Sequence, residues 1–220
     1  MNANQFETLI TELFPGITPE QISQFIEAEK AYREWNEKIN VISRKDMDGI
    51  FAHHLLHSVG IAAYAGARLK GKNILDVGTG GGFPGIPLAI LYPDASFTLC
   101  DSIRKKTLVA ENVAQSIGLK NVKVVNCRAE SLPERYDWVV SRAVASLSDF
   151  LPWVKGRYKE GILFLKGGDI NPEIAAAMAR YKLPKGSVKS WKLTQCLKQE
   201  QFLGCEDDYS WFEEKFVIEL

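Results

Sequence analysis

The spacing of apolar residues divides the chain into two parts. Up to about residue 70 the apolar positions recur every three or four residues, which predicts amphipathic helices over residues 4–14, 18–39 and 48–67. Pro15-Gly16 ends the first helix, and the second begins at Thr18, where Pro19 and Gln21 complete a capping box. We therefore expect an N-terminal helical extension over residues 1–70.

Beyond Lys72 the pattern changes to short apolar runs that alternate with helical stretches. The runs predict strands over residues 73–77, 96–100, 122–126, 137–141 and 161–165. Helices are expected over residues 86–90, 103–117, 148–159 and 171–181, the last with Asn171 as its cap and Pro172 in its first position. Two closing strands, over residues 188–193 and 212–220, should run antiparallel. This alternation indicates a mostly parallel sheet covered on both faces, a Rossmann-like α/β domain over residues 71–220.

A glycine cluster lies between the first predicted strand and the short apolar helix that follows it. The segment is Asp76-Val77-Gly78-Thr79-Gly80-Gly81-Gly82-Phe83-Pro84-Gly85. Glycines permit positive φ and let the backbone approach a ligand closely, while the free N–H groups at the start of a helix attract electron-rich atoms. A nucleotide-like cofactor therefore fits this loop. The alternative is a glycine-rich turn capped by Asp76 that binds no ligand.

Two classes of nucleotide-like cofactor match this loop. Residues 80–85 satisfy G-x-G-x-x-G, the fingerprint of dinucleotide sites, whereas the longer segment that begins at Asp76 has the form acid-x-G-x-G. Asp101 ends the next strand, at the spacing where an acid accepts both hydroxyls of a ribose. Both cofactors contain a ribose, so Asp101 supports the fold without choosing between them. Ala129 and Glu130 follow the third strand, where an adenine base would lie.

Composition limits the other classes of function. The 220 residues are 46% hydrophobic and 25% charged, as in ordinary globular proteins. The sequence contains no run of 18 apolar residues and no signal-peptide pattern, so we expect a cytoplasmic protein with no membrane segment. The four cysteines form no C-x-x-C pair, which favours reduced, buried thiols over disulfides or a zinc site.

The formal net charge of zero hides an uneven distribution. Residues 140–200 carry 11 Lys or Arg against 5 Asp or Glu, while residues 201–220 carry 1 against 6. The basic segment is suited to follow a phosphate backbone, and the alternative is the solvated face of ordinary helices. His53 and His57 share one face of a predicted helix, but the sequence has no H-E-x-x-H motif and no third ligand, so we expect no metal there.

Together these motifs resemble the RsmG family, also called GidB (glucose-inhibited division protein B), of bacterial methyltransferases that act on small-subunit ribosomal RNA. The matching segments are Trp35-Asn36 with Asn40-Val41, His54, Leu75 to Ala89, Asp101-Ser102, Ala129-Glu130, Arg142 to Ala145, and Leu165-Lys166-Gly167. The Phe-Pro-Gly-Ile-Pro continuation of the loop is far more specific than its glycines alone. One departure is visible, since the family usually has Asp-Ser where this chain has His57-Ser58.

The resemblance implies a class I S-adenosylmethionine-dependent methyltransferase that methylates N7 of one guanosine by in-line attack. It implies S-adenosyl-L-methionine as the cofactor and 16S rRNA or the small ribosomal subunit as the partner. The implied cofactor-binding residues are Asp76, Gly78, Gly80, Gly82, Phe83, Asp101, Ala129, Glu130 and Arg142. The residues expected to face the RNA, as the catalytic pair, are Arg142 and Lys166. We expect a monomer.

The chemistry available in the sequence agrees with that reaction. Guanine N7 has an in-plane lone pair and no proton, so no general base is required. The segment after the fourth predicted strand, Ser141-Arg142-Ala143-Val144, has neither the [D/N]-P-P-[Y/F] motif of amino-group methylation nor a cysteine nucleophile. Catalysis would then come mainly from positioning, which contributes up to about 7–11 kcal/mol in well-oriented reactions.

Several alternatives stay open at this point. Arg142 could instead form an ion pair with Glu130 or Asp101, or contact the carboxylate of the cofactor, and Lys166 could be a solvated strand end. For the whole chain the alternatives are a class I methyltransferase acting on a small molecule or a protein, a nicotinamide-dependent oxidoreductase, and a non-catalytic RNA-binding module.

Overall fold

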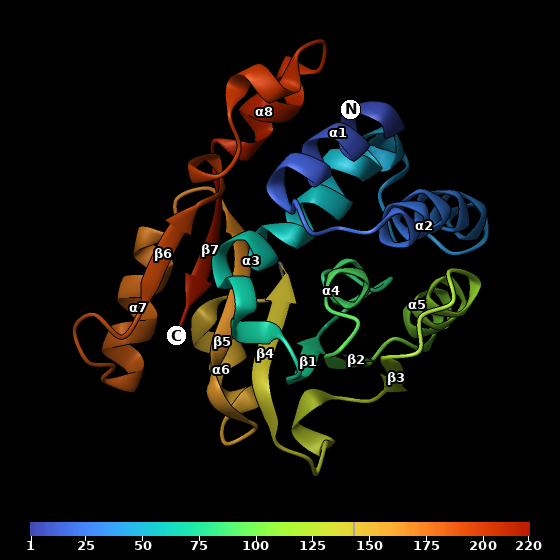
Figure 1. Ribbon diagram of the computed structural model, residues 1–220. Helices are drawn as coiled ribbons and strands as arrows, with labels where there is room; N and C mark the ends of the chain where they lie inside the picture. The colour runs from blue at the N-terminus through green and yellow to red at the C-terminus, as the bar shows by residue number, and fades with distance from the viewer. Residues whose placement is uncertain (143) are drawn as a thin grey trace.

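A seven-stranded mixed sheet forms the centre of the computed structural model, which describes residues 1–142 and 144–220 (Figure 1). The strands are β1 Asn73–Val77, β2 Ser96–Asp101, β3 Val122–Asn126, β4 Tyr136–Arg142, β5 Tyr158–Gly167, β6 Lys189–Lys192 and β7 Lys215–Glu219. Their order is β3-β2-β1-β4-β5-β7-β6, with β1 to β5 parallel and β7 antiparallel to both β5 and β6. The predicted mostly parallel sheet with antiparallel closing strands is confirmed.

Helices cover both faces of the sheet, because successive strand residues point to opposite sides. Ile74 packs into one core and its neighbour Leu75 into the other. The first face is covered by α2 Pro19–Lys38, α3 His57–Ala65, α4 Gly85–Leu91 and α5 Arg104–Ser116, and the second by α6 Leu147–Val154 and α7 Asn171–Tyr181 (Figure 1). Two further helices, α1 Ala3–Leu13 and α8 Glu206–Phe212, both contact a π-helical segment, Ile50–Leu56. No helix in the described part of the chain is long and apolar enough to span a membrane.

Helix α2 belongs to the layer that covers the sheet. It begins with the predicted capping box, in which the side chains of Thr18 and Gln21 each accept from the other's backbone N–H. Gln21 Nε2 also donates to the carbonyl of Ile90 at 2.6 Å, and Gln24 Nε2 donates to the carbonyl of Ile117 at 3.0 Å. These bonds satisfy carbonyls at the ends of α4 and α5, which have no helical partner of their own. The extension therefore helps to hold the helices beside the glycine loop.

The segment after α2 is fixed by the side chain of Asn36. Its Oδ1 accepts from the backbone N–H groups of Val41 and Ile42, at 2.8 and 2.9 Å, and its Nδ2 donates to the carbonyl of Ile42 at 2.9 Å. Asn36 is only 5% exposed, so water does not replace these bonds. They place Val41 against the glycine loop, where a Cβ on Gly81 would lie 2.8 Å from a Val41 methyl group.

Two predicted helices differ from the structure in extent. The helix expected over residues 48–67 is divided into a 3-10 turn Arg44–Gly49, the π-helical segment Ile50–Leu56, helix α3 and a 3-10 turn Gly66–Leu69. The wide π turn leaves the carbonyl of His53 open to a side chain from β4, and such turns are frequent at functional sites. The helix expected over 148–159 ends at Val154, because Gly156 takes a φ of 76° and β5 then begins at Tyr158.

The bounds predicted for α7, residues 171–181, are confirmed, but the predicted cap is wrong. Asn171 is the first helical residue rather than the cap, and Ile170 occupies the cap position. The Oδ1 atom of Asp169, two residues earlier, accepts from the backbone N–H of Asn171 at 3.1 Å, so this acid satisfies the first N–H of the helix. The strand predicted over 212–220 begins only at Lys215, because Phe212 still belongs to α8.

Replacing Asn36 by Ala should lower the free energy of unfolding by about 2–4 kcal/mol, because three buried backbone groups lose their partner. Urea unfolding measures the change. Asn112→Ala is the control: the amide of Asn112 donates to the carbonyl of Leu108 on an exposed part of α5, and its loss should change the free energy by less than about 0.5 kcal/mol. Equal effects of the two changes would contradict the role assigned to Asn36.

Candidate functional site

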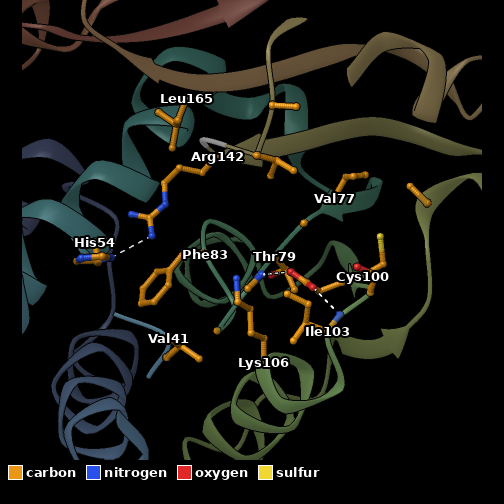
Figure 2. A pocket seen from close by; sticks show the side chains of 18 of the residues that line it. Val41, His54, Val77, Thr79, Phe83, Cys100, Ile103, Lys106, Arg142 and Leu165 are labelled. Carbon is orange, nitrogen blue, oxygen red and sulfur yellow. Dashed lines mark hydrogen bonds between the residues drawn. The ribbon is translucent and has the colours of Figure 1, made fainter. Parts of the chain in front are cut away.

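A cavity of about 910 Å³ lies at the carboxyl edge of the parallel strands, the edge at which open α/β sheets bind ligands (Figure 2). We divide it by the strands that supply its walls. The β1–β3 half is lined by residues 78–81, 101–103 and 127–130. The β4–β7 half is lined by His53, His54, His57, Arg142, Lys166, Gly167, Trp211 and Lys215. Its size is that of a cavity for a small molecule.

The glycine loop is held in shape by the buried carboxylate of Asp76. Its Oδ2 atom accepts from Thr79 Oγ1 at 2.6 Å and from the backbone N–H of Gly85 at 2.8 Å. A Cβ on Gly85 would lie 2.7 Å from that oxygen, so only glycine permits the contact. Burial raises the pKa of Asp76 to about 7, although both hydrogen bonds and the charge of Arg142 oppose the rise. The Oδ1 atom has no hydrogen-bond partner among the described residues.

Three glycines of the loop have positive φ, namely Gly78 at 67°, Gly80 at 56° and Gly82 at 114°. A Cβ on Gly80 would meet no atom within 4 Å, which leaves this part of the loop open to a ligand. A Cβ on Gly82 would instead lie 2.9 Å from the hydroxyl of Tyr32, which donates to the carbonyl of Gly81 at 2.9 Å. The ring of Tyr32 also stacks on Phe83 (4.6 Å between centroids). Helix α2 thus supports the loop from the side away from the cavity.

Asp101 lies at the end of β2 and joins the loop to α5. Its Oδ2 atom accepts from the backbone N–H of Gly80 at 3.0 Å, and its Oδ1 atom accepts from the backbone N–H of Ile103 at 2.8 Å. The carboxylate lines the cavity with its position fixed, and each oxygen retains a lone pair that can accept from a hydroxyl. This arrangement suits the two adjacent hydroxyls of a ribose.

Ala129 and Glu130 line the same half of the cavity, in a short 3-10 turn after β3. The side chain of Ala129 is buried and small, so the wall here admits a flat ring. The side chain of Glu130 is exposed, while its carbonyl accepts from Arg157 Nη2 at 2.8 Å and so fixes the turn. Together with Asp101 and the open backbone at Gly80, these residues fit a nucleoside.

Two of the sequence-predicted cofactor residues stand behind the wall rather than in it. Asp76 and Gly82 are absent from the lining formed by the described residues, whereas Gly78, Gly80 and Phe83 belong to it. Asp76 acts on the loop backbone, and Gly82 makes room for α2 and α4. A contact of either residue with a ligand stays a prediction.

Arg142 extends from the end of β4 toward the π-helical segment, beside the ring of Phe83 (Figure 2). Its Nη1 donates to the carbonyl of His53 at 3.1 Å and its Nη2 to His54 Nδ1 at 3.0 Å, while the guanidinium carbon lies 4.8 Å from the centroid of Phe83. Burial lowers the pKa of Arg142 to about 10, and the charge of Asp76 opposes the fall, so the group stays protonated at neutral pH.

The bonds of Arg142 decide one of the open alternatives. Within the described part of the chain, neither Glu130 nor Asp101 forms an ion pair with it, so the interpretation of Arg142 as their salt-bridge partner is wrong. A guanidinium has five N–H donors, and two of the five have named partners here. A contact with RNA or with a cofactor carboxylate stays a prediction.

A row of hydrogen-bonded groups continues from Arg142 through His54 and Asp46 to His53. Because His54 Nδ1 accepts from Arg142, its Nε2 carries the proton and donates to Asp46 Oδ2 at 2.8 Å. Burial, aided by the charge of Arg142, lowers the pKa of His54 to about 4, so it is neutral. His53 places Nδ1 at 2.6 Å from Asp46 Oδ1 and Nε2 at 3.3 Å from Asp208 Oδ1. Burial would lower its pKa, but these two carboxylates raise it above the ordinary value.

Lys166, at the end of β5, is not a solvated strand end. Its Nζ atom lies 2.8 Å from Glu173 Oε1 on α7, donates to the carbonyl of Ala145 at 2.5 Å, and leaves the side chain only 13% exposed. It lines the cavity, as does Glu173. The ammonium therefore ties the segment after β4 to α7, and its contact with RNA stays a prediction.

Sequence reasoning missed the aromatic and basic residues that close the β4–β7 half. Trp211 stacks on His53, with ring centroids 4.4 Å apart, and Lys215 Nζ lies 4.1 Å from the centroid of the same indole. His57 packs edge-on against Trp211, and its buried Nε2 has no hydrogen-bond partner among the described residues. Residues 201–220 had carried only the signals of an acidic tail and a last strand. Across residues 1–142 and 144–220, no group of three or more metal-ligating side chains is arranged to hold an ion.

A family model and two similar sequences carry the same description. A family model for rRNA small subunit methyltransferase G matches residues 20–202. The ribosomal RNA small subunit methyltransferase G of Christiangramia forsetii is 49% identical over 174 residues, which cover 76% of this chain and 82% of that protein. The protein of the same name from Cytophaga hutchinsonii is 48% identical over 174 residues, with 76% and 84% covered.

Solved structures agree on the fold. The magnesium protoporphyrin IX methyltransferase of Synechocystis PCC 6803, solved with bound SAM, superposes with a TM-score of 0.59 at 14% identity. The superposition covers 93% of this chain and 97% of that chain. The ribosomal protein L11 methylase of Lactobacillus delbrueckii subsp. bulgaricus gives 0.53 at 18% identity, with 74% and 75% covered. Identities this low show the fold alone, and that fold is the predicted class I methyltransferase fold.

The raised pKa of Asp76 predicts a specific dependence of stability on pH. The folded state holds the proton up to about pH 7, above the ordinary value of 3.8, so the free energy of unfolding contributed by this group falls as pH rises from about 4 to about 7. In Asp76→Asn the amide oxygen can still accept from Thr79 and Gly85, but nothing titrates. The wild-type free energy minus that of the variant, from urea unfolding at each pH, should decrease over this window. A difference that stays flat, or increases, would contradict the assignment.

Proposed function

Because this chain belongs to the ribosomal RNA small subunit methyltransferase G family, we propose that it transfers the methyl group of S-adenosyl-L-methionine to N7 of a guanosine in 16S rRNA. One observation carries the proposal. One cavity is lined both by Asp101, Gly80 and Ala129, which are suited to bind a nucleoside, and by the protonated Arg142. The acceptor would enter between them, at the carboxyl ends of β4 and β5.

The β1–β3 half is the place for the cofactor in this proposal. Asp101 accepts the ribose hydroxyls, Ala129 and Glu130 lie beside the base, and the backbone of Gly78 and the open backbone of Gly80 lie against the remainder. Asp76, Gly82 and Phe83 contribute by holding the loop in its shape. When bound, S-adenosyl-L-methionine supplies an electrophilic methyl group on a positively charged sulfur.

The proposed reaction needs no side chain to take a proton from the acceptor, and in the β4–β7 half the ring nitrogen without a partner among the described residues is the buried Nε2 of His57. His54 is neutral but both its ring nitrogens are engaged, and Lys166 is bonded to Glu173. Guanine N7 needs no such base. In the proposed reaction the lone pair of N7 would form the new N–C bond. The C–S bond of the cofactor would break, and the electron pair of that bond would stay on the sulfur. One positive charge passes from sulfur to the purine, so no net charge is created and positioning carries the catalysis.

Arg142 is the residue we assign to position the acceptor. Two of its N–H groups bind the π-helical segment and its face lies on Phe83, which leaves its remaining donors for guanine O6 or a phosphate. Lys166 has a smaller part, because Glu173 and the carbonyl of Ala145 already engage it. We further propose that the protein acts in the cytoplasm, as a monomer, on 16S rRNA or on the small ribosomal subunit.

Gly80→Ala should weaken the binding of S-adenosyl-L-methionine about tenfold or more, because the new methyl group projects into the open part of the cavity. Gly118→Ala is the matched control. Gly118 also has positive φ, 73°, and open space at its Cβ position, but it lies at the end of α5, away from the cavity. Both changes should cost similar stability, and only the first should change the Kd measured by calorimetry. Equal affinities would place the cofactor elsewhere.

The reaction itself is tested by the nucleosides of 16S rRNA. Cells that lack this chain should lose 7-methylguanosine from 16S rRNA, measured by mass spectrometry after digestion to nucleosides. The wild-type chain should restore it, and Asp101→Ala should not, because the variant lacks the acceptor for the ribose hydroxyls. If a different methylated nucleoside disappears instead, the choice of N7 as acceptor atom is wrong.

A further inference from the structure

The cations of the β4–β7 half differ in how they are engaged. Arg142 donates to His53 and His54, and Lys166 is paired with Glu173. Lys215 also lines the cavity, yet no hydrogen bond or ion pair joins its ammonium group to any residue in the described part of the chain. Its neighbour Glu214 has an exposed side chain and forms no ion pair with it either. The three N–H donors of Lys215 therefore have no acceptor among the described residues.

The ammonium of Lys215 is nevertheless held in place. Lys215 is the first residue of β7 and stands opposite Gly167 in the β5–β7 register. A Cβ on Gly167 would lie 3.0 Å from Lys215 Cδ and 3.1 Å from Nζ, so the lysine stem lies across the glycine. Its Nζ atom then rests 4.1 Å from the centroid of Trp211, and that indole is stacked on His53. Attraction between the ammonium and the ring fixes the charge at the cavity.

We propose that Lys215 binds a backbone phosphate of the substrate RNA beside the target guanosine, with Trp211 holding the ammonium in position. The inference rests on the proposed function, because it assumes an RNA acceptor in the β4–β7 half. The matching family model ends at residue 202, so the comparison assigns no role to either residue. The single basic residue among positions 201–220 thus reaches the site from a segment that is otherwise acidic.

The position of β7 favours a phosphate of the RNA over the carboxylate of the cofactor. Strand β7 is separated from β1 by β4 and β5, and three strand spacings of about 4.8 Å place it about 14 Å from the strand that carries the glycine loop. A lysine ammonium is a compact charge that binds phosphate without reading a base. The contact would therefore add affinity for RNA of any sequence, while Arg142 acts at the guanine.

Lys215→Met is the variant that tests the proposal, because methionine keeps an unbranched stem over Gly167 and removes only the charge. We expect the KM for 16S rRNA to rise about tenfold, with kcat changed less than about twofold. The slope of log affinity against log salt should become shallower by about 0.7–0.9, as for the loss of one phosphate contact. Lys215→Arg keeps the positive charge, so its KM should stay within about threefold of the wild-type value.

Lys189→Met is the matched control. Lys189 lies on the neighbouring strand β6, where it is exposed and does not line the cavity. Its ammonium group pairs with Glu219 on β7 at 3.0 Å. The control therefore removes the same charge close to the same strand. If the two methionine variants have the same KM and salt slope, the proposal is overturned. It is also overturned if Lys215→Met raises the Kd of S-adenosyl-L-methionine, since the lysine would then serve the cofactor.

The outcome can be separated from that of the proposed function. Binding of 16S rRNA to the wild type and both methionine variants is measured with S-adenosylhomocysteine present, so this arm needs no methyl transfer. A wild-type chain that binds RNA but forms no 7-methylguanosine would refute the proposed reaction, while the binding comparison still decides the role of Lys215. A thermal melt of each variant confirms that the proteins compared are folded.

Discussion

The shape of the cavity depends on one buried carboxylate. Asp76 Oδ2 accepts both from the side chain of Thr79 inside the glycine loop and from the backbone of Gly85 at the start of α4. These two bonds fix the two ends of the loop relative to β1, and the positive φ values between them follow from the tight path that remains. The cost is a buried oxygen, Oδ1, without a partner among the described residues, and burial shifts the pKa toward neutrality. A loop whose shape is fixed by bonds within the protein is what a preorganised cofactor site requires.

The parts of the site that the sequence predicts are those whose physics is local. Asp76 and the glycines lie within ten residues of each other, and Asp101 follows a strand whose end the apolar pattern marks, so the β1–β3 half could be predicted from spacing. The capping box at Thr18 is equally local. By contrast, the role of Gly82 could not be predicted, because the atoms that exclude a Cβ there belong partly to Tyr32, fifty residues earlier in the chain.

Arg142 and Lys166 of the β4–β7 half were named from the sequence, but the contacts that build this half could not be predicted, because they join residues that are distant in sequence. Arg142 and His53 are 89 residues apart, and the carbonyl that accepts from Arg142 lies in the π-helical segment, which the apolar pattern did not distinguish from an ordinary helix. Trp211 and Lys215 reach the cavity because β7 enters the sheet between β5 and β6, against chain order. A period of apolar residues reveals that a strand exists, but it carries no information about which strand it will pair with. The acidic surroundings of Lys215 in the sequence further concealed it.

The choice of histidine as the partner of Arg142 has a consequence for catalysis. A carboxylate in direct contact with the guanidinium would neutralise it and leave little charge for an incoming nucleotide. Here the contacts are a carbonyl and the neutral ring of His54, so the charge of Arg142 is positioned but not cancelled. The carboxylate of Asp46 lies on the other side of the His54 ring from Arg142. It accepts from His54 Nε2 and so fixes the tautomer of the ring. The negative charge of Asp46 is matched in turn by His53, whose pKa it helps to raise. In the proposed reaction, which moves a positive charge between two partners, alignment matters more than a base, and this row of groups would hold Arg142 in position while it keeps the cation available.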